Sequence, residues 1–134
     1  MGESSFDWSR YLQLAEELAA QRNEASLRSA ISRAYYFVYH LALSRAKTNG
    51  FLPVRNESQH AQLWELFTRN PDPACMKLGE VGNRLRAIRA RADYENRFRR
   101  IEDEVGEVIR DAKSFAADLN TLAARLPSPQ SIRR

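Results

Sequence analysis

The chain has 134 residues, of which 43% are hydrophobic and 28% charged, a balance typical of one soluble globular domain. It contains one cysteine, Cys75, which excludes an intramolecular disulfide and fits a reducing compartment. The least polar run, 34–43, includes His40 and is too short to cross a bilayer. Because no apolar leader is visible at the N-terminus, we expect a cytoplasmic protein with no membrane partner.

The positive charge is concentrated in one segment. Residues 84–100 contain seven arginines, one aspartate and one glutamate, a net charge of +5 in a chain whose net charge is +4. The rest of the chain is therefore close to neutral. Such a segment favours binding of a polyanion, for example nucleic acid. Alternatively, it is only the exposed face of a helix, since arginine is a good helix former.

Apolar residues recur with helical spacing along almost the whole chain, and no alternating strand pattern is convincing. A first helix is predicted to begin near Asp7, a suitable N-cap. A second covers about 24–47 and ends at the Asn-Gly pair of 49–50, a common helix stop. Ser58 can cap a short third helix, which the prolines of 70–73 terminate.

Two further helices complete the predicted bundle. The fourth begins near Ala74, and the fifth runs from Ile101 to Leu126 with apolar residues at alternating spacings of four and three. Short connections favour antiparallel neighbours, so we expect an all-α, antiparallel up-and-down bundle of four long helices and one short helix. It would form one domain over 5–126, with 127–134 as a flexible tail.

The second helix has more apolar surface than one core requires. Beyond its core stripe it carries aromatic side chains that point in nearly every direction, which indicates burial on more than one side. These side chains are Tyr35, Tyr36, Phe37 and Tyr39. A partner subunit could cover the second side, which predicts a homodimer through the region of this helix. The alternative is a thick core within one chain.

Helical spacing arranges the arginine segment in rows at the corner between the fourth and fifth helices. Asp93 can form an ion pair with Arg89, one turn earlier, or with Arg97 across the turn, so part of the cluster could be structural. The remaining positive charge favours an acidic partner. The predicted ligand-binding residues are Arg86, Arg89, Arg91, Asp93, Tyr94 and Arg97.

The sequence supports catalysis less well than binding. The only histidines, His40 and His60, do not lie at metal-ligand spacing with each other or with the cysteine, so no metal site and no cofactor are predicted. His40 either packs in the core or lines a site. A tyrosine hydroxyl is a poor general base near neutral pH. The catalytic residues, if any, are unknown, and the candidates are Arg89, Tyr94 and His40.

Two motifs together resemble those of small bacterial and archaeal HEPN-domain proteins. SRAYYFVYHLAL, at 32–43, resembles the Ser-Arg-Ala-Tyr-Tyr segment of their second helix. RARADYE, at 89–95, resembles their Arg-x-x-Ala-Asp-Tyr motif with Arg89 as its arginine. VIRDAKSFAADL, at 108–119, is similar to their long last helix, and the resemblance covers about 7–125. It implies a HEPN-like helical bundle that dimerises.

Many HEPN proteins are metal-independent RNases with an Arg-x4-6-His motif, others pair with a nucleotidyltransferase in toxin–antitoxin modules, and others bind nucleotides or RNA. Here no histidine follows His60, and the x4 spacing from Arg89 falls on Tyr94. The resemblance therefore implies first a homodimeric module that binds RNA or nucleotide phosphates. One alternative is a toxin-like RNase that uses His40 in place of the motif histidine. Another is a partner subunit of a nucleotidyltransferase, whose acidic surface would meet the arginines.

Overall fold

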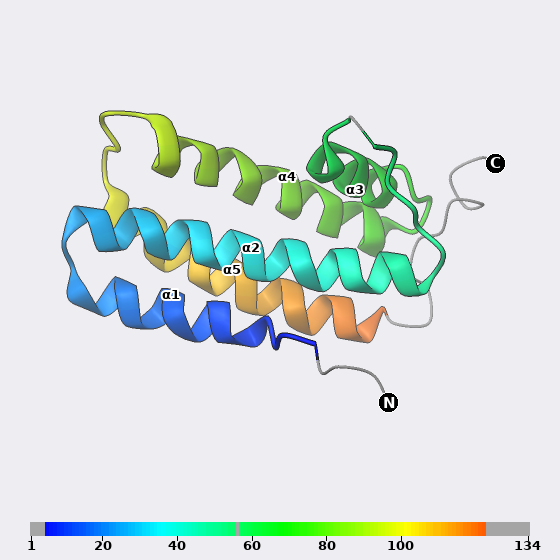
Figure 1. Ribbon diagram of the computed structural model, residues 1–134, viewed down its shortest axis with the longest axis horizontal. Helices are drawn as coiled ribbons and strands as arrows, with labels where there is room; N and C mark the ends of the chain where they lie inside the picture. The colour runs from blue at the N-terminus through cyan, green and yellow to red at the C-terminus, as the bar shows by residue number, and fades with distance from the viewer. Residues whose placement is uncertain (1–4, 56, 123–134) are drawn as a thin grey trace.

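The computed structural model describes residues 5–55 and 57–122, and all regular structure in these residues is helical. The described residues form five helices, which Figure 1 labels: α1 Ser9–Gln21, α2 Glu24–Thr48, α3 Gln59–Thr68, α4 Pro73–Tyr94 and α5 Ile101–Thr121. The predicted all-α class is confirmed. The predicted last turn of the fifth helix, to Leu126, and the predicted tail 127–134 lie outside the described residues.

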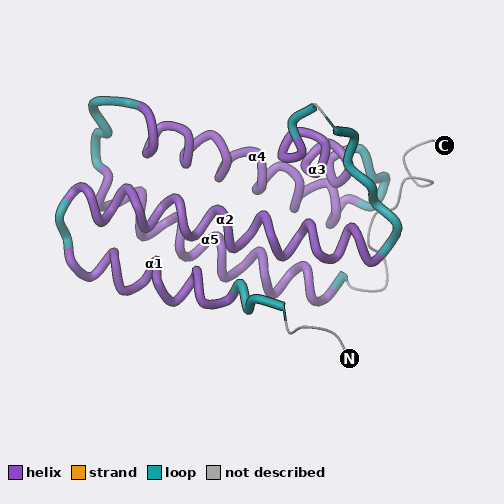
Figure 2. The backbone as a smooth tube through the Cα atoms, viewed as in Figure 1, coloured by secondary structure: helices purple, strands orange, loops and turns teal. Residues whose placement is uncertain are grey.

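The long helices α2 and α5 pack against each other, with α1 along one side of α2 and α4 along the other (Figure 1). α1 and α4 run in one direction and α2 and α5 in the other. α3 lies across the end of the bundle at which α2 finishes and α4 begins (Figure 2). α1 has 13 residues and begins at Ser9, two residues after the predicted start near Asp7.

Side-chain caps explain where the helices begin. Asn23 caps α2 and Ser58 caps α3, each accepting a hydrogen bond from a backbone N–H in the first turn. Asp72 caps α4 in the same way, and Pro73 occupies the first turn, where its missing N–H is not needed. The carboxylate of Asp7 accepts the first backbone N–H of α1 at 3.0 Å, although the helix begins two residues after it.

The core lies between α2 and the helices around it. Its largest fully buried side chains include Tyr35, Trp64, Phe67 and Phe115, which come from three different helices. Three of the four aromatic residues in the second helix are buried within one chain, and Tyr36 alone is partly exposed. A thick intramolecular core therefore accounts for most of the apolar surplus on α2.

Two glycines allow α4 to approach α3 closely. A Cβ atom added at Gly82 would overlap the indole ring of Trp64, and one added at Gly79 would lie 2.5 Å from the side chain of Thr68. Side chains larger than hydrogen would separate the two helices. The glycines thus hold α3 against α4 and fix the position of Trp64.

The C-terminal end of α4 is anchored to α2 by one arginine. The guanidinium of Arg28 donates hydrogen bonds to three backbone carbonyl oxygens, those of Ala92, Glu95 and Asn96, at 2.6–3.3 Å. The last carbonyl groups of a helix have no partner within the helix, so a cation that binds them stabilises its end. Arg28 therefore fixes the corner that carries the arginine segment.

Candidate functional site

The arginines of 84–100 do not form one uniform basic surface. Four of them are in ion pairs, namely Arg84–Asp111, Arg89–Asp93, Arg91–Glu95 and Arg100–Asp103. Arg91 also lies over the ring of Phe98, 4.3 Å from its centroid. Arg86, Arg97 and Arg99 have no ion pair with any residue that the structure describes. The segment therefore contains two groups of arginines: those whose ion pairs stabilise the corner, and those whose positive charge is not compensated by a described residue.

Arg89 lies on the inner side of α4, with 16% of its side chain exposed. Its Nη1 donates to the carboxylate of Asp93 at 2.9 Å, and its guanidinium lies over the rings of Tyr35 and Tyr36 at 5.7 and 5.6 Å. Its Nε is buried and has no hydrogen-bond partner among the described residues. A purely structural Arg–Asp pair favours two parallel hydrogen bonds. Arg89 forms a single hydrogen bond to Asp93, so most of its N–H donors have no partner among the described residues.

His60 lies close enough to this arginine to feel its charge, and the sequence did not predict His60 as a site residue. Its ring stacks on Tyr39 with a centroid distance of 4.0 Å, and its Nδ1 is 2.6 Å from the hydroxyl of Tyr35. It comes from the first turn of α3, four residues before the buried Trp64. That spacing places both residues on one face of the helix. It is the signal that could have identified His60.

Arg86 completes the group from the neighbouring turn of α4. Its Nη2 donates to the hydroxyl of Ser58 at 3.3 Å, at the residue that caps α3. Arg86 and Arg89 both act electrostatically on His60 and on Tyr35. We call the group formed by α2, α3 and α4 the Arg–His site. It comprises Tyr35, Tyr36, Tyr39, His60, Arg86 and Arg89.

The two hydrogen-bonded rings in the site are neutral at physiological pH. Burial, together with the positive charges of Arg86 and Arg89, lowers the pKa of His60 to about 4. Burial raises the pKa of Tyr35 to about 12, against the opposing effect of a hydrogen bond from Trp64. The positive charge of the Arg–His site therefore comes from its arginines.

The other predicted site residues lie around this group rather than in it. Tyr94 is 79% exposed and Arg97 is exposed, and the side chain of neither forms a hydrogen bond, ion pair or ring contact with another described residue. His40 lies on the side nearer α1, where its ring stacks on Trp8 at 3.5 Å and nearly parallel. The structure thus brings together Arg86, Arg89 and Asp93, and leaves Arg91, Tyr94 and Arg97 at the corner.

The chemistry available to the site is hydrogen bonding and charge. Among residues 5–55 and 57–122, no three His, Cys, Asp or Glu residues gather to form a metal-binding group. Cys75 is buried, and burial raises the pKa of its thiol to about 12, so it is not an activated nucleophile. The site offers several N–H donors, two arginine charges and the faces of aromatic rings, which suits an oxyanion with an attached ring.

Comparisons of the chain with protein-family models, curated proteins and solved structures found no match. The HEPN resemblance therefore stays a prediction. In the part of the chain that the structure describes, no helix combines the length and the apolar character that crossing a membrane requires.

Proposed function

We propose that the Arg–His site binds a phosphate group of RNA or of a nucleotide, in a HEPN-like homodimeric module. The observation that carries the proposal is the largely enclosed guanidinium of Arg89. Asp93 and the rings of two tyrosines fix its position, and only one of its five N–H groups is used within the described residues. A fixed planar guanidinium with free donors matches the geometry of a phosphate.

The balance of charge supports the same function. Asp93 is the single carboxylate paired with Arg89, and Arg86 has no carboxylate partner among the described residues, so one positive charge is left over. Uncompensated charge at a partly buried position favours an anionic ligand. The partly exposed ring of Tyr36 lies under Arg89 and offers a face on which a base could stack.

Fluorescence anisotropy with labelled single-stranded RNA and transfer RNA, at two salt concentrations, tests the proposal. Arg89→Ala should weaken binding by about tenfold or more, because a charged hydrogen bond to phosphate is lost. Arg97→Ala is the matched control, since it removes the same charge from an exposed residue that forms no hydrogen bond or ion pair with any described residue. Equal losses in the two variants would reject the Arg–His site and favour diffuse attraction to the corner.

A toxin-like RNase is the second candidate, and the position of His60 beside Arg89 favours it. His60 then takes the role that the sequence assigned to His40. The same assay scores cleavage, with His60→Ala and His40→Ala compared. Cleavage that only His60→Ala abolishes would establish the enzyme. If no RNA binds at low salt, the arginines face an acidic protein instead, such as the nucleotidyltransferase partner that the family resemblance implies.

The homodimer is the remaining part of the proposal. The homodimer is supported by a small apolar surface on α2, where Tyr36 and Leu41 are partly exposed. Sedimentation velocity across a range of protein concentrations measures the association directly. A dimer that Tyr36→Arg dissociates would place the interface on α2. Monomers at every concentration would remove the homodimer from the proposal and leave the Arg–His site to act alone.

A further inference from the structure

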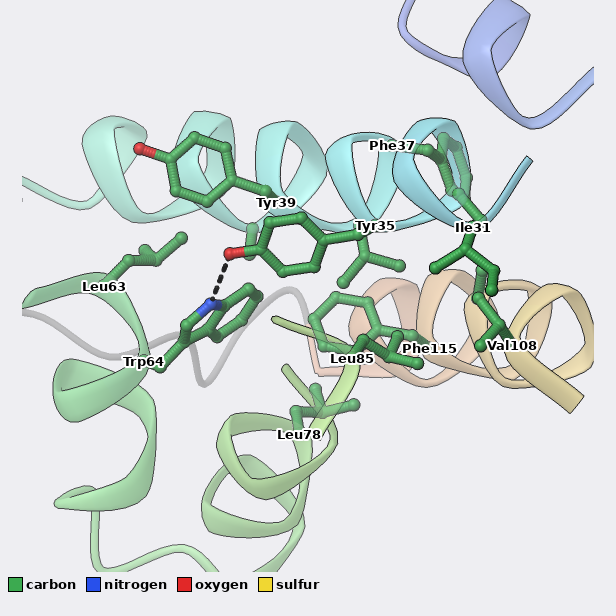
Figure 3. Close-up of a cluster of buried hydrophobic side chains, with 14 of the residues drawn as sticks. Ile31, Tyr35, Phe37, Tyr39, Leu63, Trp64, Leu78, Leu85, Val108 and Phe115 are labelled. Carbon is green, nitrogen blue, oxygen red and sulfur yellow. Dashed lines mark hydrogen bonds between the residues drawn. The ribbon is translucent and has the colours of Figure 1, made fainter. Parts of the chain in front are cut away.

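A chain of hydrogen bonds leads from the buried core to His60. The indole Nε1–H of Trp64, which can only donate, lies 3.0 Å from the hydroxyl oxygen of Tyr35 (Figure 3). The same hydroxyl lies 2.6 Å from Nδ1 of His60. Tyr35 and Trp64 are both fully buried, so water does not replace either partner. The direction of each bond in this chain is therefore constrained.

These constraints determine which nitrogen of His60 carries its proton. Because Tyr35 accepts from Trp64, its own O–H is free to donate, and Nδ1 is the only acceptor within reach among the described residues. If Nδ1 carried a proton instead, the buried O–H would have no acceptor, and an unsatisfied buried donor is costly. The arrangement that satisfies all three groups leaves Nδ1 without a proton and places the proton on Nε2.

The Nε2 atom is the open end of the chain. It has no hydrogen-bond partner among the described residues. It is also not fully buried, so a ligand or water can reach it. The charged and titratable groups facing the ring are Arg86 and Arg89 from α4 and the tyrosines and His40 from α2. The cationic neighbours oppose a second proton, so the ring presents one N–H group to the surface.

We infer that His60 is a fixed neutral N–H donor of the Arg–His site, and that Tyr35 and Trp64 are the positioning residues that hold it in this state. The inference rests on the proposed function for the ligand, but the position of the proton does not. With Arg86, Arg89 and His60 all donating, the ligand oxygens at the site must be acceptors. That condition selects a phosphodiester or a fully ionised terminal phosphate.

The same arrangement separates binding from cleavage. A general base needs a lone pair on the nitrogen that faces the ligand. In His60 that nitrogen is Nε2, which holds the proton, while the lone pair on Nδ1 accepts from Tyr35. The geometry therefore assigns His60 to ligand recognition, and it argues against the second candidate function, in which His60 would abstract a proton.

The first experiment measures the tautomer in the ligand-free protein. Long-range ¹H–¹⁵N correlation spectra of histidine-labelled protein at pH 7 distinguish the Nε2–H form, the Nδ1–H form and the imidazolium. His40→Gln assigns the two rings. We expect the Nε2–H pattern for His60 and a shift toward mixed tautomers in Tyr35→Phe. An Nδ1–H or imidazolium pattern in the wild-type protein would overturn the inference. If Tyr35→Phe does not fold, Trp64→Phe is used, because it releases the hydroxyl oxygen without removing it.

The second experiment tests the donor role with a labelled oligouridine as the probe and inorganic phosphate as competitor. Glutamine can accept from Tyr35 through its carbonyl oxygen and donate outward through its amide, so His60→Gln imitates the Nε2–H form. We expect His60→Gln to bind within about threefold of wild type and His60→Ala to lose about tenfold. Equal losses in both variants would overturn the donor role. A wild-type protein that shows the Nε2–H pattern but binds no oligouridine would refute the proposed function alone and leave the tautomer standing.

Discussion

At the scale of single residues, His60 makes the stability of the fold depend on pH. Its pKa is about 4 in the folded protein and near 6.5 in the unfolded chain, so the folded state binds fewer protons between these values. The stabilisation is complete above pH 6.5 and is lost as the pH falls toward 4. The full shift corresponds to about 3 kcal/mol, but the ring is only half-buried and is screened by solvent, so we expect roughly 1–2 kcal/mol.

Urea denaturation at pH 4.5 and pH 7 measures this dependence. The free energy of unfolding of wild-type protein should fall more steeply toward pH 4.5 than that of His60→Gln, because glutamine does not titrate. Acidic residues titrate alike in both proteins, so the difference between the two slopes isolates His60. Identical slopes would mean that the imidazole is not desolvated in the folded state.

Some residues of the site could be predicted from the sequence and others could not. The Arg89–Asp93 pair follows from helical spacing, because residues four apart lie on one face. The contact between Tyr35 and His60 does not, since 25 positions separate them and the contact depends on how α3 docks. The sequence pointed to the corner beyond α4, whereas the side-chain contacts converge on its inner face. The density of arginine at the corner favoured residues such as Tyr94, which is exposed and forms no hydrogen bond or ring contact with any described residue.

At the scale of elements, two glycines in α4 decide how closely it packs on α3. Replacing Gly82 with alanine gains helix propensity of about 1 kcal/mol, but the added methyl group overlaps the ring of Trp64. Overpacking of this kind costs about 1–3 kcal/mol. We therefore expect Gly82→Ala to be net destabilising and to displace Trp64, which should weaken binding at the Arg–His site as well.

Gly106 provides the control for that prediction. It lies within α5, and an added Cβ atom would meet nothing within 4 Å. Gly106→Ala should therefore stabilise the protein by about 0.5–1 kcal/mol through helix propensity alone. Thermal denaturation followed by circular dichroism compares the two variants. Stabilisation in both would show that α3 and α4 can separate without loss, contrary to the close approach seen here.

Arg28 gives a second test at this scale. Its three hydrogen bonds to carbonyl oxygens at the end of α4 are charge-assisted, and Arg28→Met keeps much of the apolar stem while removing all three. We expect a loss of about 1–3 kcal/mol and faster amide hydrogen exchange in the last turn of α4. Arg69→Met, which breaks an exposed pair with Glu65, should change stability by less than about 0.5 kcal/mol. If Arg28→Met lost no more stability than Arg69→Met, packing alone would hold the end of α4 in place.

The helical elements themselves were largely predictable, because amphipathic spacing and capping residues are local signals. α2, α3 and α4 begin within a residue or so of their predicted positions, at Glu24, Gln59 and Pro73. The close contact that Gly79 and Gly82 permit was not predictable, since a glycine within a helix shows only that a side chain is missing. What it approaches depends on the neighbouring helix. Local order follows from the sequence, whereas the site depends on the docking of three helices.

At the scale of the whole molecule, the positive charge of 84–100 is mostly balanced where it stands. Ion pairs neutralise four of its seven arginines, and Arg97 and Arg99 are exposed and form no hydrogen bond or ion pair with the described part of the chain. Two models of RNA binding then differ in a measurable quantity. A compact site uses Arg86 and Arg89, whose remaining donors could contact about two phosphates, whereas a diffuse surface would engage all seven arginines and break their ion pairs. The number of phosphates neutralised determines how steeply the affinity falls with salt.

For single-stranded RNA, the slope of log K against log salt is about −0.7 for each phosphate neutralised, so the compact site predicts a slope of roughly −1.4 and the diffuse surface roughly −5. We expect a slope between about −1 and −2, measured by anisotropy titration of the same oligouridine. Arg86→Ala should reduce its magnitude by about 0.7, because one contact is removed. The double variant Arg97→Ala/Arg99→Ala, which removes more charge from the corner, should leave it unchanged. A slope near −5 that becomes shallower in the double variant would show that RNA binds at the corner and not at the inner face of α4. The exposed Tyr94 would then lie next to the RNA.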